Sequence, residues 1–187
     1  MISCTKTVLF TCFRNIPKPN FVFPSRSLVL KRLELYGVYL KSNLLPSLPD
    51  CLEVLVLSKV KADSDLEPSP VPLRYLEVAY CSSKTLSRVI NGFVAGIREL
   101  YFSFAESSSR WSTTPITDCR RVEEFNLTCR HNDKDQVNRM LEQLLTSGAN
   151  LRRLVSYSAD ERSVILLRRF KNIQQLALVS YHNAPFR

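Results

Sequence analysis

Apolar residues recur along this chain in a six-residue pattern, with apolar side chains at positions 1, 4 and 6 and mostly polar or small ones between them. Six copies are complete, and in one further copy Ser156 takes the last apolar position. Successive copies start 22, 21, 24, 25, 29 and 22 residues apart, which indicates a repeat array. The copies read LKRLEL (30–35), LEVLVL (52–57), LRYLEV (73–78), IRELYF (97–102), VEEFNL (122–127), LRRLVS (151–156) and IQQLAL (173–178).

Each copy has the alternation of a short β-strand. Positions 4 and 6 point to the same face, because side chains alternate along a strand. One such strand cannot bury its apolar face alone, but neighbours stacked at a fixed period form a continuous core. The pattern therefore predicts seven parallel strands in chain order, with Leu76 fully buried. An eighth, degenerate copy is expected from Thr5, with Val8 and Phe10 in the inward positions.

Some connections between copies have helical periodicity, and others do not. Helices are predicted at about 84–93, 135–146 and 160–170, on the layer opposite the strands. Residues 59–72 and 105–119 are rich in Ser, Pro and Asp and are predicted to be loops. The apolar helix positions are Leu86, Val89, Ile90 and Phe93, then Val137, Met140, Leu141, Leu144 and Leu145, and finally Leu166, Leu167 and Phe170.

Cap residues flank two of these helices. Asp133 or Asp135 is a candidate N-cap for the second helix, with Gly148 as its C-cap. Asp160 or Ser158 is the candidate N-cap of the third.

These repeats resemble the leucine-rich-repeat family over residues 30–187. The stretch LRYLEVAYC, with Cys81 eight residues after the repeat start, is similar to the cysteine-containing subtype, as is PDCLEVLVL with Cys51. That subtype is familiar from F-box leucine-rich-repeat proteins, which present substrates to a ubiquitin ligase. The resemblance implies an α/β solenoid with short parallel strands on a concave face and helices and loops on the convex side. It also implies substrate recognition, with a ubiquitin-ligase adaptor as a partner.

The chain divides into an N-terminal segment, 1–29, with a possible degenerate repeat, and an array of about seven repeats, 30–187. The first thirty residues contain no F-box-like segment, and the chain ends nine residues after the last copy. Solenoids need polar capping repeats. We therefore expect a fragment, or a degenerate member of a larger architecture.

The composition is that of an ordinary globular protein: 187 residues, 45% hydrophobic and 23% charged. The sequence contains no run of eighteen apolar residues, so it predicts no membrane-spanning helix. The first fifteen residues make a poor signal peptide, and the six cysteines form no CxxC pair. These features favour free cysteines in a reducing compartment, and a cytoplasmic or nuclear location.

The net charge of +9 is concentrated at the two ends. Residues 1–41 carry +6 and residues 151–187 carry +5, whereas residues 42–150 carry −2. The alternative function is therefore a nucleic-acid-associated protein that uses its basic ends. Joining of these ends into one stripe would favour this alternative, and scatter over the surface would oppose it.

The sequence offers little catalytic chemistry. Only His131 and His182 are present, and Cys129, His131 and Asp133 are the sole conceivable metal cluster, without the second ligand pair of a structural zinc site. There is no glycine-rich phosphate loop and no carboxylate pair fixed by spacing. We expect a protein without catalysis, metal or cofactor.

The repeat does predict a binding surface. Residues two, four and six after each start alternate with the inward ones and should line the concave face. Glu99 and Glu124 fall in one column on adjacent strands, so we expect mild repulsion between them in the free protein. The face carries aromatics beside carboxylates, which suits a protein partner better than phosphates. The predicted partner-binding residues are Tyr75, Glu77, Glu99, Tyr101, Glu124 and Asn126.

Overall fold

A computed structural model describes most of the chain. The described residues are 6–11, 30–62, 64–93, 96–104, 115–128, 134–157 and 160–179.

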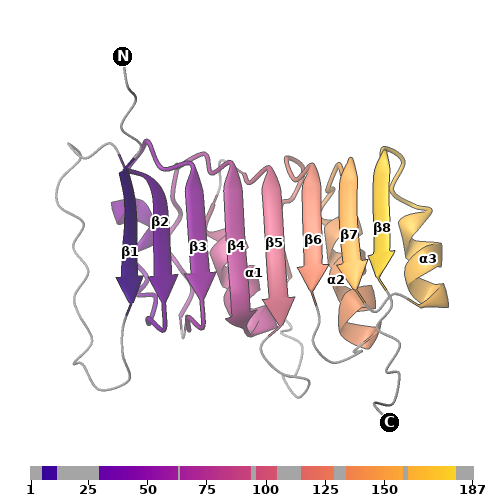
Figure 1. The fold of residues 1–187 in the computed structure, drawn as a ribbon, viewed down its shortest axis with the longest axis horizontal. Coiled ribbons are helices and arrows are strands. Elements are labelled where there is room, and N and C mark those ends of the chain that lie inside the picture. The colour runs from indigo at the N-terminus through magenta and orange to yellow at the C-terminus, as the bar shows by residue number, and fades with distance from the viewer. Residues whose placement is uncertain are drawn as a thin grey trace, which may run out of the picture.

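The strands form a single all-parallel sheet of eight, ordered as they occur in the sequence (Figure 1). The fold is therefore α/β, and the predicted seven neighbouring parallel strands are confirmed. The strands are β1 (Lys6–Thr11), β2 (Leu30–Tyr36), β3 (Val54–Ser58), β4 (Tyr75–Cys81), β5 (Glu99–Phe104), β6 (Glu124–Thr128), β7 (Arg153–Tyr157) and β8 (Gln175–Val179).

The strand expected near Thr5 is β1, which pairs in parallel with β2. Its register sets Val8 against Leu33 and Phe10 against Leu35. The sheet thus continues without a break from the N-terminal segment into the repeats.

The register between strands follows the repeat template. Leu76 on β4 pairs with Leu55 on β3 and with Leu100 on β5, all at the fourth position of their copies. These inward residues form the core, and Leu76 is completely buried as expected. From β2 to β7 the apolar side chains at the fourth and sixth positions are at most 2% exposed: Leu33, Leu35, Leu55, Leu57, Leu76, Val78, Leu100, Phe102, Phe125, Leu127 and Leu154.

Three helices supply the opposing layer. They are α1 (Ser83–Asn91), α2 (Lys134–Thr146) and α3 (Glu161–Leu167). In Figure 1, α1 and α2 lie behind the sheet and α3 lies beside β8. The predicted apolar faces are buried, apart from Leu145, which packs partly buried against the core. Among the described residues, the connections between β1 and β4 contain no α-helix and only a short 3-10 helix, η1 (Leu45–Ser47).

Helix ends differ in detail from the expectations. Asp135 is not the N-cap of α2, because it lies inside the first turn of a helix that begins at Lys134; Asp133 is outside the described residues. Gly148 has a left-handed φ of 79° after α2, as a C-cap glycine requires. Asp160 caps α3 in a reciprocal capping box with Ser163. α3 ends at Leu167 rather than near residue 170, and Phe170 reaches the core from the turn that follows.

The eighth residue of the copy adopts the same unusual backbone in three neighbouring repeats. Gly37, Lys59 and Tyr80 all stand eighth in their copies and have φ of 70°, 53° and 55°. Left-handed backbone is uncommon for Lys and Tyr. Gly37 and Lys59 directly follow β2 and β3, whereas Tyr80 lies within β4, where the register to β5 shifts. The repeat is therefore present in the backbone as well as in the side chains.

Within the described part of the chain, no helix is both long and apolar enough to cross a membrane. The predicted loop at 59–72 holds no helix or strand beyond isolated bridges at Lys61 and Ser69, with residue 63 not described. Most of the second predicted loop, 105–114, lies outside the described residues.

Candidate functional site

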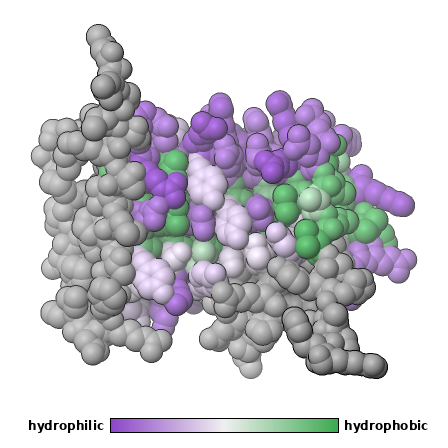
Figure 2. Space-filling model, viewed as in Figure 1, coloured by the Kyte–Doolittle hydropathy of each residue, from purple (hydrophilic) through white to green (hydrophobic). Residues whose placement is uncertain are grey.

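We call the sheet face opposite the helices the open face. It faces the viewer in Figures 1 and 2, and it consists of the residues two, four and six after each repeat start. Its columns follow the expected alignment: Arg32, Val54, Tyr75, Glu99, Glu124, Arg153 and Gln175 are successive partners across the sheet. The second column runs through Glu34, Val56, Glu77, Tyr101, Asn126, Val155 and Ala177 in the same way.

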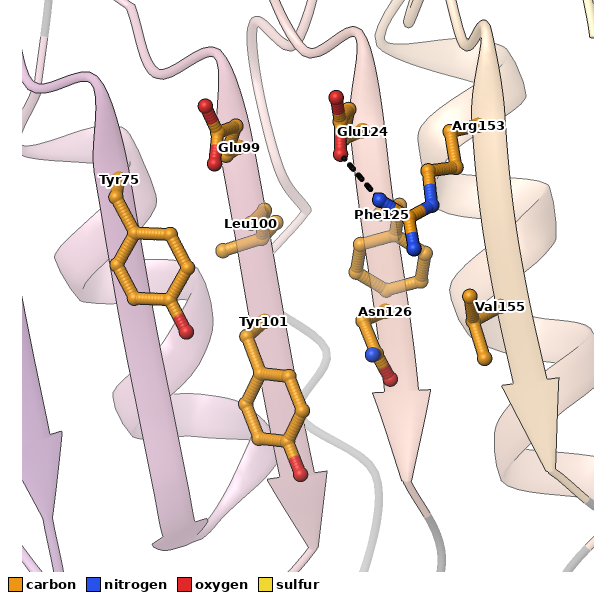
Figure 3. A pocket seen from close by; sticks show the side chains of 9 residues that line it. All are labelled: Tyr75, Glu99, Leu100, Tyr101, Glu124, Phe125, Asn126, Arg153 and Val155. Atoms are coloured by element: carbon orange, nitrogen blue, oxygen red, sulfur yellow. Dashed lines mark hydrogen bonds and ion pairs between the residues drawn. The ribbon is translucent and has the colours of Figure 1, made fainter. Parts of the chain in front are cut away.

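A depression of about 200 Å³ lies in the middle of the open face, over β4 to β7. Figure 3 shows two tyrosine rings on one side, two glutamates at one end and an arginine and a valine on the far side. The strand segments of Leu100 and Phe125 form its base. Its other residues are Tyr75, Glu99, Tyr101, Glu124, Asn126, Arg153 and Val155.

The two tyrosines are held by their hydroxyl groups. Tyr75 donates a 2.9 Å hydrogen bond to Glu77 two residues along β4. The Tyr101 hydroxyl lies 3.0 Å from the Thr128 hydroxyl on β6. Burial, and then the Glu77 carboxylate, raise the pKa of Tyr75, so its hydroxyl stays protonated and remains a donor. Both rings are therefore fixed, half-buried apolar surfaces that lose little freedom when a partner binds.

The carboxylates of the depression have cationic neighbours. Arg74 Nε lies 3.0 Å from Glu99 Oε1, and Arg153 Nη1 lies 3.4 Å from Glu124 Oε2. An arginine beside each carboxylate offsets part of its charge, and the expected repulsion between Glu99 and Glu124 stays a prediction. Neither arginine was among the predicted site residues.

Asn126 is the one residue lining the depression that has a buried polar side-chain atom without a hydrogen-bond partner. Its Oδ1 atom is buried and has no hydrogen-bond partner. A buried acceptor left without a donor costs about 1–3 kcal/mol. A ligand that brings an N–H group recovers that energy when the Asn126 side chain turns its oxygen toward the depression.

The structure brings together five of the six predicted residues. Glu77 lies outside the depression and supports Tyr75 from below. Arg153 and Val155 could have been found, since they occupy the same two columns one strand further on. Arg74 could not, because the period of two places position 74 on the same face as Leu76, whereas Arg74 precedes the strand and its exposed side chain reaches Glu99.

The structure describes only some of the residues that the sequence analysis considered for metal binding or nucleophilic chemistry. Cys129, His131 and Asp133 lie outside the described residues, and within the described ranges no three His, Cys, Asp or Glu side chains gather as a metal site would require. Burial raises the pKa of the Cys81 and Cys119 thiols to about 11, so neither is an activated nucleophile.

The described parts of the two basic ends do not form one stripe. Lys31 and Arg32 are on β2 and pair with Glu53 and Glu34. The C-terminal arginines around Arg152 are at the other end of the eight-stranded sheet. The basic residues between β1 and β2 are outside the described residues.

The site thus offers fixed aromatic surface, paired charges and an unfilled acceptor on a rigid sheet, a combination suited to binding. Compared with protein-family models, with curated proteins and with solved structures, the chain shows no significant match.

Proposed function

We propose that this chain is a leucine-rich-repeat solenoid that binds a protein segment on its open face and has no catalysis of its own. The support is the repeat period of 21 to 29 residues together with parallel strands stacked in chain order. Such an array presents one residue per repeat in each column, which makes an extended surface for an extended partner.

The observation that carries the proposal is the pair of fixed tyrosines in the central depression. Tyrosine anchors beside polar groups are characteristic of protein interfaces, and residues at the centre of an interface dominate its affinity. Tyr75 and Tyr101 lie on adjacent strands, so their backbone positions are set by the sheet rather than by a loop.

The specific role we propose is substrate recognition for an F-box-type ubiquitin ligase, through an adaptor region, in the cytoplasm or nucleus. It rests on the resemblance of the cysteine-containing repeats, which is an argument by analogy.

Site-specific photo-crosslinking tests the open face. A crosslinking amino acid is placed at position 101, and a matched control is placed at Arg139, an exposed position on α2. We expect discrete protein adducts from position 101 in cell extract, lost when Tyr75 is changed to Ala and kept when the exposed Tyr39 is changed to Ala. Equal adducts at 101 and 139 would contradict the proposal.

The ligase role needs a separate measurement. The proteins crosslinked at position 101 should become less ubiquitylated and longer-lived in cells when Tyr75 and Tyr101 are both changed to Ala. Unchanged ubiquitylation, with the adducts themselves lost, would leave protein binding in place and remove the ligase role.

A further inference from the structure

We propose that the depression receives a lysine or arginine side chain of the partner, and that Arg153 occupies this place in the free protein as an internal substitute. The proposal rests on the proposed function, because it names the chemistry of the same site. It is argued from charge, from the unfilled acceptor and from the position of Arg153.

The first step is charge. The open face carries four glutamates, Glu34, Glu77, Glu99 and Glu124, against Arg32 and Arg153. The shortest contact of Arg74 is with Oε1 of Glu99, and that of Arg153 is with Oε2 of Glu124. A carboxylate can accept about four hydrogen bonds, so one contact with an arginine leaves both Glu99 and Glu124 able to accept from an added cation.

The second step is the acceptor. Ammonium and guanidinium groups carry only hydrogen-bond donors, and the buried Oδ1 of Asn126 can only accept. A partner carboxylate would instead place acceptors beside Asn126 Oδ1 and beside Glu99 and Glu124. Apart from Arg153, the charged and accepting groups of the depression therefore favour a cation over an anion.

The third step is the apolar wall. Lysine and arginine have long aliphatic stems that bury on apolar surface while the charged head reaches a polar group. The rings of Tyr75 and Tyr101 line one side of the depression, as Figure 3 shows. They can cover the stem of the incoming side chain, and a cation near a ring face gains further from the ring quadrupole.

The fourth step is Arg153 itself. Figure 3 shows its side chain reaching from β7 toward Glu124 on β6, across the site of Phe125. The contact is 3.4 Å, longer than the 3.0 Å contact between Arg74 and Glu99. The Arg153 side chain is 54% exposed, and exposed pairs are weak, so a partner cation that also reaches Asn126 can displace it.

This arrangement makes a prediction of unusual sign. Removing a polar residue from a binding site normally weakens binding, whereas removing an internal competitor strengthens it. Arg153→Ala should therefore increase the affinity for a basic peptide. Arg152→Ala is the matched control, because it removes the same charge from the neighbouring, exposed position and leaves the depression intact.

The experiment uses a phage library of random twelve-residue peptides, selected on the purified full chain. We expect the peptides that lose binding to Tyr101→Ala to share a Lys or Arg at one position. Changing that residue to Gln should weaken binding about tenfold, the factor expected for one charged hydrogen bond. Glu124→Gln should weaken the same peptides by about threefold or more, by the same arithmetic.

The arginine variants complete the test. Arg153→Ala and Arg153→Gln should bind the basic peptides about threefold more tightly, whereas Arg152→Ala should not. A threefold gain corresponds to less free energy than one charged hydrogen bond contributes. Peptides that share an acidic residue and bind Arg153→Ala more weakly would overturn this inference and leave the proposed function standing. A selection that yields no peptide dependent on Tyr101 would overturn both.

Discussion

β4 and β8 carry the same template but lie in different environments. In β4, Leu76 and Val78 are completely buried, whereas in β8 Leu176 is 49% and Leu178 is 41% exposed. β4 lies between two strands, while β8 pairs with β7 alone among the described strands. The comparison shows that burial in this fold is supplied by the neighbours of a strand and not by its own residues.

The helical layer repeats this difference. α2, which packs behind the interior strands, buries Val137 and Leu144 completely. α3 buries Leu166 but leaves Ile165 57% and Val164 39% exposed. Stability should therefore be graded along the array, with the β7–α3–β8 end contributing least.

The largest expected effect is the difference between one leucine substitution in β4 and one in β8. Leu76→Ala should lower the free energy of unfolding by about 2–5 kcal/mol, because it opens a cavity in the packed interior. The equivalent change in the terminal strand, Leu176→Ala, should lower it by less than about 1 kcal/mol, the range of half-exposed positions. Urea denaturation followed by circular dichroism measures both.

Equal losses for the two variants would contradict the graded picture. A large loss at Leu176 would mean that β8 is covered as well as β4, and a small loss at Leu76 would mean that the strand register is wrong.

The sequence predicted the strands well because their signal is local. A period of two fixes which residues face the core, and the repeat spacing fixes the neighbours, so the column of Tyr75, Glu99 and Glu124 was predictable. The difference between Leu76 and Leu176 was not, because both occupy the fourth template position. Only the presence of neighbouring strands distinguishes them.

The charges of the site were harder to predict for a different reason. Long side chains choose partners by rotamer, and rotamers do not follow the strand period. Arg74 lies one residue before β4 yet reaches Glu99 on the next strand. The predicted mutual repulsion of Glu99 and Glu124 took no account of these arginines, because the sequence gives no direction for the side chain of Arg74 or Arg153.

The next effect concerns the start of α3. Asp160 accepts from the Ser163 backbone at 2.8 Å and from Asn138 of α2 at 3.2 Å, so it both caps α3 and ties it to α2. Asp160→Ala should lower the free energy of unfolding by about 0.5–2 kcal/mol. Glu161→Gln, in the same first turn but exposed, is the control and should change it little. Equal effects of the two changes would show that general helix charge matters and the cap does not.

The cap also gives a pH dependence. Burial opposes ionisation of Asp160, but the hydrogen bonds from Ser163 and Asn138 outweigh it and lower its pKa below the ordinary 3.8. The contribution is therefore complete above pH 3.8 and is lost as the pH falls through the lower, folded-state pKa. The wild type should lose more stability on acidification than Asp160→Ala does. Parallel urea curves at neutral and acidic pH measure this, and identical acid losses would contradict it.

A smaller effect on stability is expected from substitution of Ser156, the one polar residue at an inward template position of β7. Ser156 takes an inward position between Leu127 and Leu178, and its buried hydroxyl has no partner. Ser156→Ala should therefore raise the free energy of unfolding by up to about 1 kcal/mol, because an unsatisfied buried group is removed. Ser156→Val, which restores the template, should raise it further if the site has room. Ser58→Ala, on the open face, is the control, and a loss on Ser156→Ala would mean that the hydroxyl has a role in the fold.

The smallest expected effect lies at the open face. Glu99 and Glu124 each face an arginine, Arg74 and Arg153, in contacts that are largely exposed. Changing both glutamates to Gln removes two weak attractions, so stability should fall slightly at low salt and the difference should vanish at high salt, where surface charges are screened. Mutual repulsion would give the opposite sign, a gain at low salt. Urea curves at two ionic strengths therefore separate the two arrangements: a gain at low salt would mean that the arginines do not hold these carboxylates in solution, and Glu124 would then be free for a partner without displacement of Arg153.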